Sequence, residues 1–382
     1  MPPLLSRITR GATEARARAV LAPFVVSRAV VLASLVLTRH VVTALHASPA
    51  PVQVGDGLLA WDASWYRDIA RHGYGGVAKE GLRFFPFVPM LARVGSWLPG
   101  VSVRLALLLV VNASALAVGA LVYDLARNEG RGDAVARRAV WIVYLAPPAF
   151  VLVMGYAEAT LMTATLVALL ALRRRRWWVA AVAGVVAGLT RPVGLLLVVP
   201  ALVEAYRAPR SRARGASTRR DYAARAAAVL GSVAGAGAYL LWAEHRSGDL
   251  FYPLRVQQAS ARRGGWIDPA RAVWRAVRDA SSGDHLSATI HVVTVAVLVA
   301  LLVVLWRRWP VSFTAYAVVA VGVALSARNL DSLERYSLST VPLVLAAAEL
   351  VGGGMRERLV LVAMGATLVA FSVLAFTGVL VP

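Results

Sequence analysis

The sequence has no cysteine and lacks several motifs of soluble enzymes, and each absence excludes a class of chemistry. Without cysteine there is no disulfide, no thiolate metal site and no thiol nucleophile. No Asp-x-Asp pair occurs, so the usual carboxylate pair for a metal and a sugar nucleotide is missing. Neither a Gly-x-Ser-x-Gly turn nor a Walker A loop is present. Serine hydrolysis and P-loop nucleotide chemistry are therefore not expected.

Acidic residues are also scarce, whereas apolar and basic residues are abundant. Hydrophobic residues make up 59% of the 382 residues, and the mean hydropathy is +0.65. There are 41 Lys and Arg against 20 Asp and Glu, a formal net charge of +21. Such an excess fits nucleic acid or an anionic membrane surface. The long apolar runs favour the membrane surface over nucleic acid, and we expect no nucleic-acid partner.

The apolar runs predict an all-α polytopic membrane protein, because a span needs about 20 apolar residues. The first run follows several arginines and has no clear cleavage site after it, so we interpret it as a retained span rather than a signal peptide. We expect about eleven transmembrane helices in a single domain, residues 1–382, with amphipathic helices in the outer loops. The predicted spans lie near 20–45, 101–126, 139–154, 157–172, 177–190, 192–206, 226–243, 287–306, 311–326, 337–350 and 359–380.

The distribution of arginine predicts the orientation. If the N-terminus is cytoplasmic and the spans alternate, the run Arg173–Arg176 and the loop 207–225 lie inside, as the positive-inside rule requires. The two long connections, 47–100 and 244–286, then lie outside, together with 327–337. We therefore expect a multi-pass protein of the cell membrane whose chemically unusual segments share the extracytoplasmic face.

The second outer loop contains a helix signal of its own. Asp268 followed by Pro269 is typical of a helix N-terminus. Arg271, Arg275 and Arg278 then recur on one face, which predicts a basic amphipathic helix suited to anionic headgroups. The loop either anchors the protein to the surface or covers a lipid-linked substrate.

The first outer loop holds the most distinctive stretch, residues 61–74. Trp61, Trp65 and Ile69 recur at helical spacing and predict a short helix that lies flat on the membrane surface. We expect Asp62 to open this helix and to cap its free N–H groups. A cap within an aromatic interfacial belt is the alternative interpretation of the stretch.

Two arginines at the ends of predicted spans are candidates for contact with a phosphate. Arg191, beside Pro192, and Arg335 can each extend to the headgroup level or hold a phosphate oxygen by paired hydrogen bonds. Their position beside aromatic loops suggests an anionic lipid headgroup. Glu158 lies between two short spans, and it either caps the second of them or lines the pocket.

The motif Trp-Asp-x-x-Trp-Tyr-x-x-Ile-Ala-x-x-Gly-Tyr at 61–74, followed by Phe-Phe-Pro-x-x-Pro at 84–89, resembles the PIG-V family of membrane mannosyltransferases, in particular its actinobacterial members. Residues 247–266 and the sequence Glu-Arg-Tyr at 334–336 are similar to later elements of that family. Ala63 and Val88 depart from its usual Gly and aromatic residue. The resemblance implies the GT-C architecture, in which a large first outer loop carries an essential Asp.

The resemblance also implies an activity: inverting transfer of a sugar, mannose above all, from a polyprenyl-phosphate donor to an acceptor hydroxyl on the outer face. The acceptor would be a glycolipid or a glycan, and neither a metal nor another cofactor is indicated. Asp62 matches the family's essential Asp and would be the catalytic general base, while cations would stabilise the leaving phosphate. The candidate substrate-binding residues are Trp61, Trp65, Tyr66, His72, Tyr74, Arg191, Gln258, Arg263, Arg335 and Tyr336.

Two other functions stay open. A lipid or glycan transporter would use the same arginines to hold a headgroup and would move its substrate between leaflets with no chemistry. A structural membrane subunit would leave the Trp-Asp motif without a purpose. An enzyme differs from both because it releases polyprenyl phosphate and forms a new product.

Overall fold

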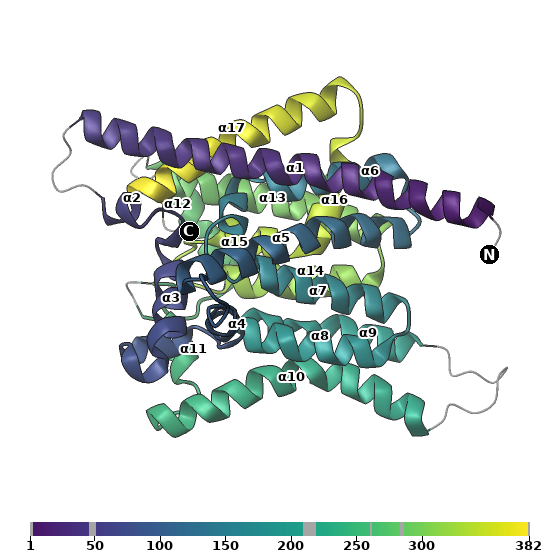
Figure 1. Cartoon of the computed structure of the whole chain (residues 1–382), viewed down its shortest axis with the longest axis horizontal. Helices are drawn as coiled ribbons and strands as arrows, with labels where there is room; N and C mark the ends of the chain where they lie inside the picture. The colour runs from purple at the N-terminus through teal and green to yellow at the C-terminus, as the bar shows by residue number, and fades with distance from the viewer. Residues whose placement is uncertain (1–2, 46–50, 209–218, 260–261, 283–285, 381–382) are drawn as a thin grey trace.

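The computed structural model describes residues 3–45, 51–208, 219–259, 262–282 and 286–380. Within these residues every regular element is a helix, which confirms the predicted all-α class. Most of the longer helices run side by side along one direction (Figure 1). Much of the predicted basic loop 207–225, and short pieces of both long connections, lie outside the described residues.

Five helices in the described part of the chain are long and apolar enough to cross a membrane, and shorter apolar helices accompany them. The protein is therefore a multi-pass membrane protein. The five long helices are α1 (Pro3–Ala44), α5 (Val103–Asn128), α10 (Arg219–Ser247), α13 (Leu286–Arg308) and α17 (Met355–Thr377). The shorter ones include α8 (Trp177–Thr190), α14 (Val311–Leu325) and α16 (Val341–Val351).

Several predicted spans are short or interrupted helices, and proline explains the breaks, because it cannot donate the next helical hydrogen bond and restricts the residue before it. The run 139–154 comprises α6 (Asp133–Leu145) and the 3₁₀ helix η4 (Pro147–Leu152). The run 192–206 comprises η5 (Pro192–Leu197) and α9 (Val198–Arg207), and 337–350 is divided between α15 (Leu333–Ser339) and α16. The remaining span, α7 (Glu158–Arg173), is almost wholly buried among its neighbours.

Short helices gather at one end of the molecule, opposite the marked N-terminus and the turn between α7 and α8 (Figure 1). We call this end, formed by residues 51–100, 249–259 and 262–282, the site end. It contains α2 (Val52–Asp56), η1 (Gly57–Leu59), α3 (Asp62–His72), η2 (Tyr74–Gly76), η3 (Lys79–Arg83), α4 (Phe87–Gly95), α11 (Tyr252–Gln257) and α12 (Pro269–Ser281).

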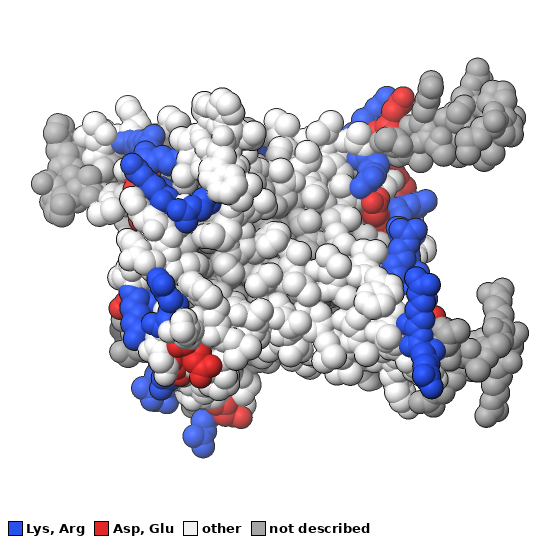
Figure 2. All heavy atoms as spheres, turned by 60° about the horizontal axis from the view of Figure 1, so that its bottom comes forward, with Lys and Arg blue, Asp and Glu red and all other residues white. Residues whose placement is uncertain are grey.

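On one face of the molecule, charged side chains collect at its two ends. On the face shown in Figure 2, Lys, Arg, Asp and Glu gather at both ends and leave an uncharged band between them. A bilayer core imposes this distribution, because ionised side chains in contact with hydrocarbon are costly. The long axis of the helices therefore lies across the membrane.

Helices α8 and α10 pack closely because glycines face each other. A Cβ added to Gly188 would lie 2.4 Å from the carbonyl oxygen of Ser232, and one added to Gly231 would lie 2.3 Å from that of Ala181. Such contacts between backbones need residues without a side chain, which is a common solution for helix pairs in membranes.

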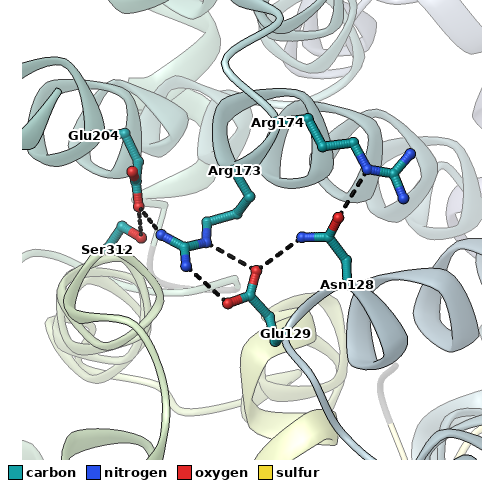
Figure 3. A network of polar contacts seen from close by, with 6 residues as sticks. All are labelled: Asn128, Glu129, Arg173, Arg174, Glu204 and Ser312. Carbon is teal, nitrogen blue, oxygen red and sulfur yellow. Dashed lines mark hydrogen bonds and ion pairs between the residues drawn. The ribbon is translucent and has the colours of Figure 1, made fainter. Parts of the chain in front are cut away.

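A buried ion-pair network joins four helices at the end opposite the site (Figure 3). Arg173 donates two hydrogen bonds to Glu129, of 2.8 and 2.9 Å, and one of 3.0 Å to Glu204. Ser312 donates a 2.6 Å hydrogen bond to Glu204. Arg173, which the sequence suggested only as a topological anchor, therefore also links the ends of α5 and α7 to α9 and α14.

Candidate functional site

The predicted interfacial helix is α3, and it begins at Asp62 as expected. Its start is not the predicted cap, however. Trp61 occupies the N-cap position with a φ of 60°, and no side chain caps the helix. A tryptophan at positive φ is uncommon and strained, and its indole N–H is held by the carbonyl oxygen of Ala375 in α17 at 2.9 Å. The prediction that Asp62 caps its own helix is therefore wrong, and its carboxylate has a distant partner instead.

That partner is Arg335 of α15. Nη1 of Arg335 donates a 2.7 Å hydrogen bond to Oδ2 of Asp62, and its Nε lies 3.3 Å from Oε1 of Glu158. Arg191, which follows α8, also forms an ion pair with Glu158. We call Asp62, Arg335, Glu158 and Arg191 the site ion-pair chain. Its carboxylates and guanidinium groups alternate, and Arg335, Glu158 and Arg191 are 6%, 1% and 8% exposed.

The surrounding cations keep Asp62 ionised. Burial alone would raise the pKa of this carboxyl group, but the guanidinium groups of Arg335, Arg83 and Arg191 outweigh burial and lower the pKa below its ordinary value of 3.8. Asp62 is therefore a carboxylate at neutral pH, and it can accept a proton.

In front of Asp62 lies a cavity of about 370 Å³. This volume is within the usual range for small-molecule sites, and most of the wall is apolar. The polar groups converge on one region, where α3, η3, the start of η5 and the segment after α11 meet. The lining residues that bear on function are Asp62, Tyr66, Arg83, Phe84, Arg191, Gln258, Arg263, Trp266 and Tyr336.

Arg83 and Arg263 line the cavity without a carboxylate partner in the described part of the chain. Arg83 lies 4.4 Å from the ring centre of Phe84, and Arg263 lies 4.8 Å from that of Tyr336. Arg263 donates to the carbonyl oxygen of Ala324 at 2.9 Å. Because the site ion-pair chain balances its own charges, these two cations give the cavity a positive surplus that an anion can neutralise.

Arg83 is not among the site residues predicted from the sequence. The signal that could have indicated it is its position: it immediately precedes the Phe-Phe-Pro motif and lies within the same outer loop as Asp62. Arg263 reaches the cavity because residues 263–265 pair with the segment before α15. There the N–H of Asn329 donates to the carbonyl oxygen of Arg263 at 2.9 Å, and that of Arg328 donates to Gly265 at 3.1 Å.

The structure brings together most, but not all, of the predicted site residues. Asp62, Tyr66, Arg191, Gln258, Arg263 and Tyr336 line the cavity, and Arg335 contacts Asp62 beside it. Trp61, Trp65, His72 and Tyr74 are not among the lining residues.

Three of these four residues form the support of the site instead. Trp61 binds α17 through its indole, as described above, and Trp65 stacks on Phe84 with ring centres 5.5 Å apart. Tyr74 donates a 2.6 Å hydrogen bond to the carbonyl oxygen of Phe84. His72 is exposed at the last position of α3. A direct contact with substrate is therefore better supported for the lining residues.

The predicted helix of the second outer loop is confirmed as α12. Oδ1 of Asp268 accepts hydrogen bonds from the N–H groups of Ala270 (2.9 Å) and Arg271 (3.2 Å), as its position before Pro269 indicated. Trp274 on this helix is 67% exposed. An exposed tryptophan on a basic amphipathic helix is typical of a segment at the level of the headgroups.

Comparison with known proteins adds no identification. No protein-family model matches the chain, and no curated protein is significantly similar to it. Within the described residues, no group of three or more His, Asp and Glu side chains is placed to hold a metal ion.

Proposed function

We propose that this protein is an inverting glycosyltransferase of the PIG-V type with a GT-C architecture. It transfers a sugar, with mannose the first candidate, from a polyprenyl-phosphate donor to a hydroxyl group of a glycolipid or glycan. One observation carries the proposal: an ionised aspartate opens into a cavity that also holds arginines without an ion-pair partner among the described residues, inside an apolar protein with several spans. The choice of reaction rests on the resemblance of the Trp-Asp motif, which contains this aspartate, to the PIG-V family.

Asp62 acts as the general base. Its carboxylate removes the proton of the acceptor hydroxyl while the acceptor oxygen attacks the anomeric carbon from the side opposite the phosphate. The bond between that carbon and the phosphate oxygen breaks, its electron pair leaves with the polyprenyl phosphate, and the configuration inverts. A positioned base of this kind contributes about 10²- to 10⁴-fold to the rate.

Arg83, Arg191 and Arg263 hold the phosphate. The donor is a phosphodiester with one negative charge, whereas the departing polyprenyl phosphate carries about −1.5 to −2 at neutral pH. Negative charge therefore increases at the phosphate during the reaction. Fixed guanidinium groups bind it more strongly in the transition state than in the ground state, which is the condition for catalysis. The two arginines without a carboxylate partner supply this charge.

The remaining wall suits a sugar. The faces of Tyr66, Phe84 and Trp266 are flat and apolar, and the amide of Gln258 can donate to or accept from sugar hydroxyl groups. The isoprenoid chain of the donor remains in the surrounding apolar phase. The protein's partners are therefore the lipid-linked donor, the acceptor and the lipids of the bilayer.

We place the site on the extracytoplasmic face of the cell membrane and the N-terminus in the cytoplasm. Arg173–Arg176 connects α7 to α8 at the end opposite α3 (Figure 1). A dense run of arginines in a short loop favours the cytoplasmic side. A donor that stays in the membrane can reach the site end directly from the outer leaflet.

The test compares Asp62→Asn with Asp68→Asn in proteoliposomes supplied with polyprenyl-phosphate mannose and a membrane glycolipid fraction. Asp68 is a matched control, because it belongs to the same helix but pairs with Arg67 at 2.7 Å and is 41% exposed. We expect Asp62→Asn to lower kcat by about 10²- to 10⁴-fold and Asp68→Asn to stay near wild type. Equal activity of Asp62→Asn and wild type would remove Asp62 as the base, and movement of intact donor between leaflets would identify a transporter.

A further inference from the structure

Glu158 is a buried carboxylate that the proposed reaction does not yet use. It is the first residue of α7, it is 1% exposed, and it is not among the residues that line the cavity. The N-cap position of α7 belongs to Ala157, and no side chain caps the helix. Neither role that the sequence suggested, a cap or a pocket wall, describes Glu158.

Glu158 holds two arginines that approach from different elements. Arg335 comes from α15 and Arg191 from the extended residue between α8 and η5, and both form ion pairs with the same carboxylate. Two guanidinium groups this close repel each other strongly in a buried environment. A carboxylate between them fixes both positions and removes part of their positive charge.

Both arginines also act on the groups that react. Arg335 donates directly to Asp62, and Arg191 lines the cavity. The charged and titratable groups around Asp62 are therefore Arg335 of α15, Arg191 after α8, Glu158 of α7, Arg83 of η3, Arg263 of the second long connection, and the nearby phenols Tyr66, Tyr156 and Tyr336. Glu158 is the one carboxylate besides Asp62 in this set.

We propose that Glu158 is a positioning residue that divides the positive charge of Arg191 and Arg335 between itself, Asp62 and the donor phosphate. This inference rests on the proposed glycosyl transfer. Because Glu158 forms ion pairs with both guanidinium groups, less positive charge acts on the carboxylate of Asp62. Asp62 is therefore a stronger base. It also moderates the attraction for phosphate, so that the leaving polyprenyl phosphate is released.

Removal of this charge weakens catalysis without weakening donor binding. Without Glu158 the arginines neutralise Asp62 more fully and proton removal slows. The same arginines bind the donor phosphate more strongly, so the KM for donor does not rise. A loss of folded protein would lower the apparent kcat alone, so rates are expressed per folded protein, whereas a distorted donor site would raise KM.

The experiment measures steady-state transfer from polyprenyl-phosphate mannose by wild type, Glu158→Gln and Glu204→Gln. Glu204 is a matched control. It is also a buried carboxylate, 3% exposed and paired with an arginine at 3.0 Å (Figure 3), but it belongs to α9 at the end opposite the site (Figure 1). We expect Glu158→Gln to lower kcat by about 10- to 100-fold, the scale on which small misplacements of catalytic groups act, with an equal or lower KM. Glu204→Gln loses thermal stability but keeps both constants.

A second variant protects the test against misfolding. Glu158→Asp keeps the charge and shortens the side chain by one methylene, so we expect it to recover part of kcat at an unchanged KM. If Glu158→Gln raises KM, or if it resembles Glu204→Gln in both constants while wild type transfers sugar, the positioning role is wrong and the proposed function stands. Absence of transfer by wild type would overturn both.

Discussion

Replacement of Arg335 by methionine tests the site ion-pair chain most severely. Methionine has a similar length and no charge, so it fills the space but removes the cation between two carboxylates. Arg335 is 6% exposed and contacts Asp62 at 2.7 Å and Glu158 at 3.3 Å. After the change Glu158 keeps Arg191 as a partner, whereas Asp62 loses its direct hydrogen bond.

The size of the effect follows from burial. Removal of one partner of a buried ion pair costs about 3–5 kcal/mol, because the remaining charge is left uncompensated. The side chain of Asp62 is 23% exposed and Glu158 keeps one partner, so we expect the lower end, about 3 kcal/mol. At about 2 °C per kcal/mol for a large chain, Tm falls by about 6 °C.

The sign of the pH dependence follows from the lowered pKa of Asp62. A carboxyl group whose folded pKa lies below its unfolded value contributes stability above the unfolded pKa, and this stability is lost as the pH falls through the folded value. The contribution of Asp62 is therefore complete at pH 7 and declines only below about 3.8. The loss of Tm in Arg335→Met is therefore largest near neutral pH, and the part due to Asp62 shrinks below pH 3.8.

The assay is thermal unfolding of the purified protein in detergent at pH 7 and at the lowest pH it tolerates. Arg308→Met is the control, because Arg308 pairs with Glu349 at 3.2 Å but its side chain is 63% exposed. An arginine this exposed contributes about 0–1 kcal/mol, and the buried carboxylate of Glu349 keeps Arg131 as a partner at 3.0 Å, so Tm changes little. If Arg335→Met melts within about 1 °C of wild type at pH 7, or if Arg308→Met loses as much, the electrostatic account of the site is refuted.

Three further predictions use the same protein. The pH profile of kcat/KM has no acid limb from Asp62 between about pH 5 and 8, because its pKa lies below 3.8. Arg335→Met moves this limb upward, because it removes the strongest of the cations that offset burial. Arg173→Met lowers stability by about 3–5 kcal/mol with kcat unchanged, as thermal unfolding and transfer assays would show. Gly188→Ala destabilises the protein, because the new Cβ would collide with the backbone of α10. Gly237→Ala has no atom within 4 Å of its new Cβ, so it stabilises the protein by up to about 1 kcal/mol. The melting temperatures of the two variants should move in opposite directions.

Features that depend on local chemistry could be predicted from the sequence. The start of α3 at Asp62 and the cap of α12 by Asp268 each follow from a few adjacent residues. The apolar runs indicated where helices lie, because hydrophobic length alone determines which segments can cross a bilayer.

Features that depend on distant residues could not be predicted. The carboxylate of Asp62 turns from its own helix to Arg335, 273 positions along the chain. The ion pairs of Glu158 likewise join segments that meet only in the folded protein. Aromatic residues were over-assigned to the cavity: Trp65 and Tyr74 stack on or bond to other parts of the loop, because large rings serve packing as readily as binding.

The central claim is that the arginines of this cavity hold the phosphate of a lipid-linked sugar within reach of Asp62. The most direct measurement is a structure of the Asp62→Asn protein with polyprenyl-phosphate mannose bound. We expect the phosphate to lie about 3 Å from the guanidinium groups of Arg83, Arg191 or Arg263, with the anomeric carbon facing residue 62. A phosphate bound outside this cavity, or a sugar turned away from residue 62, would contradict it.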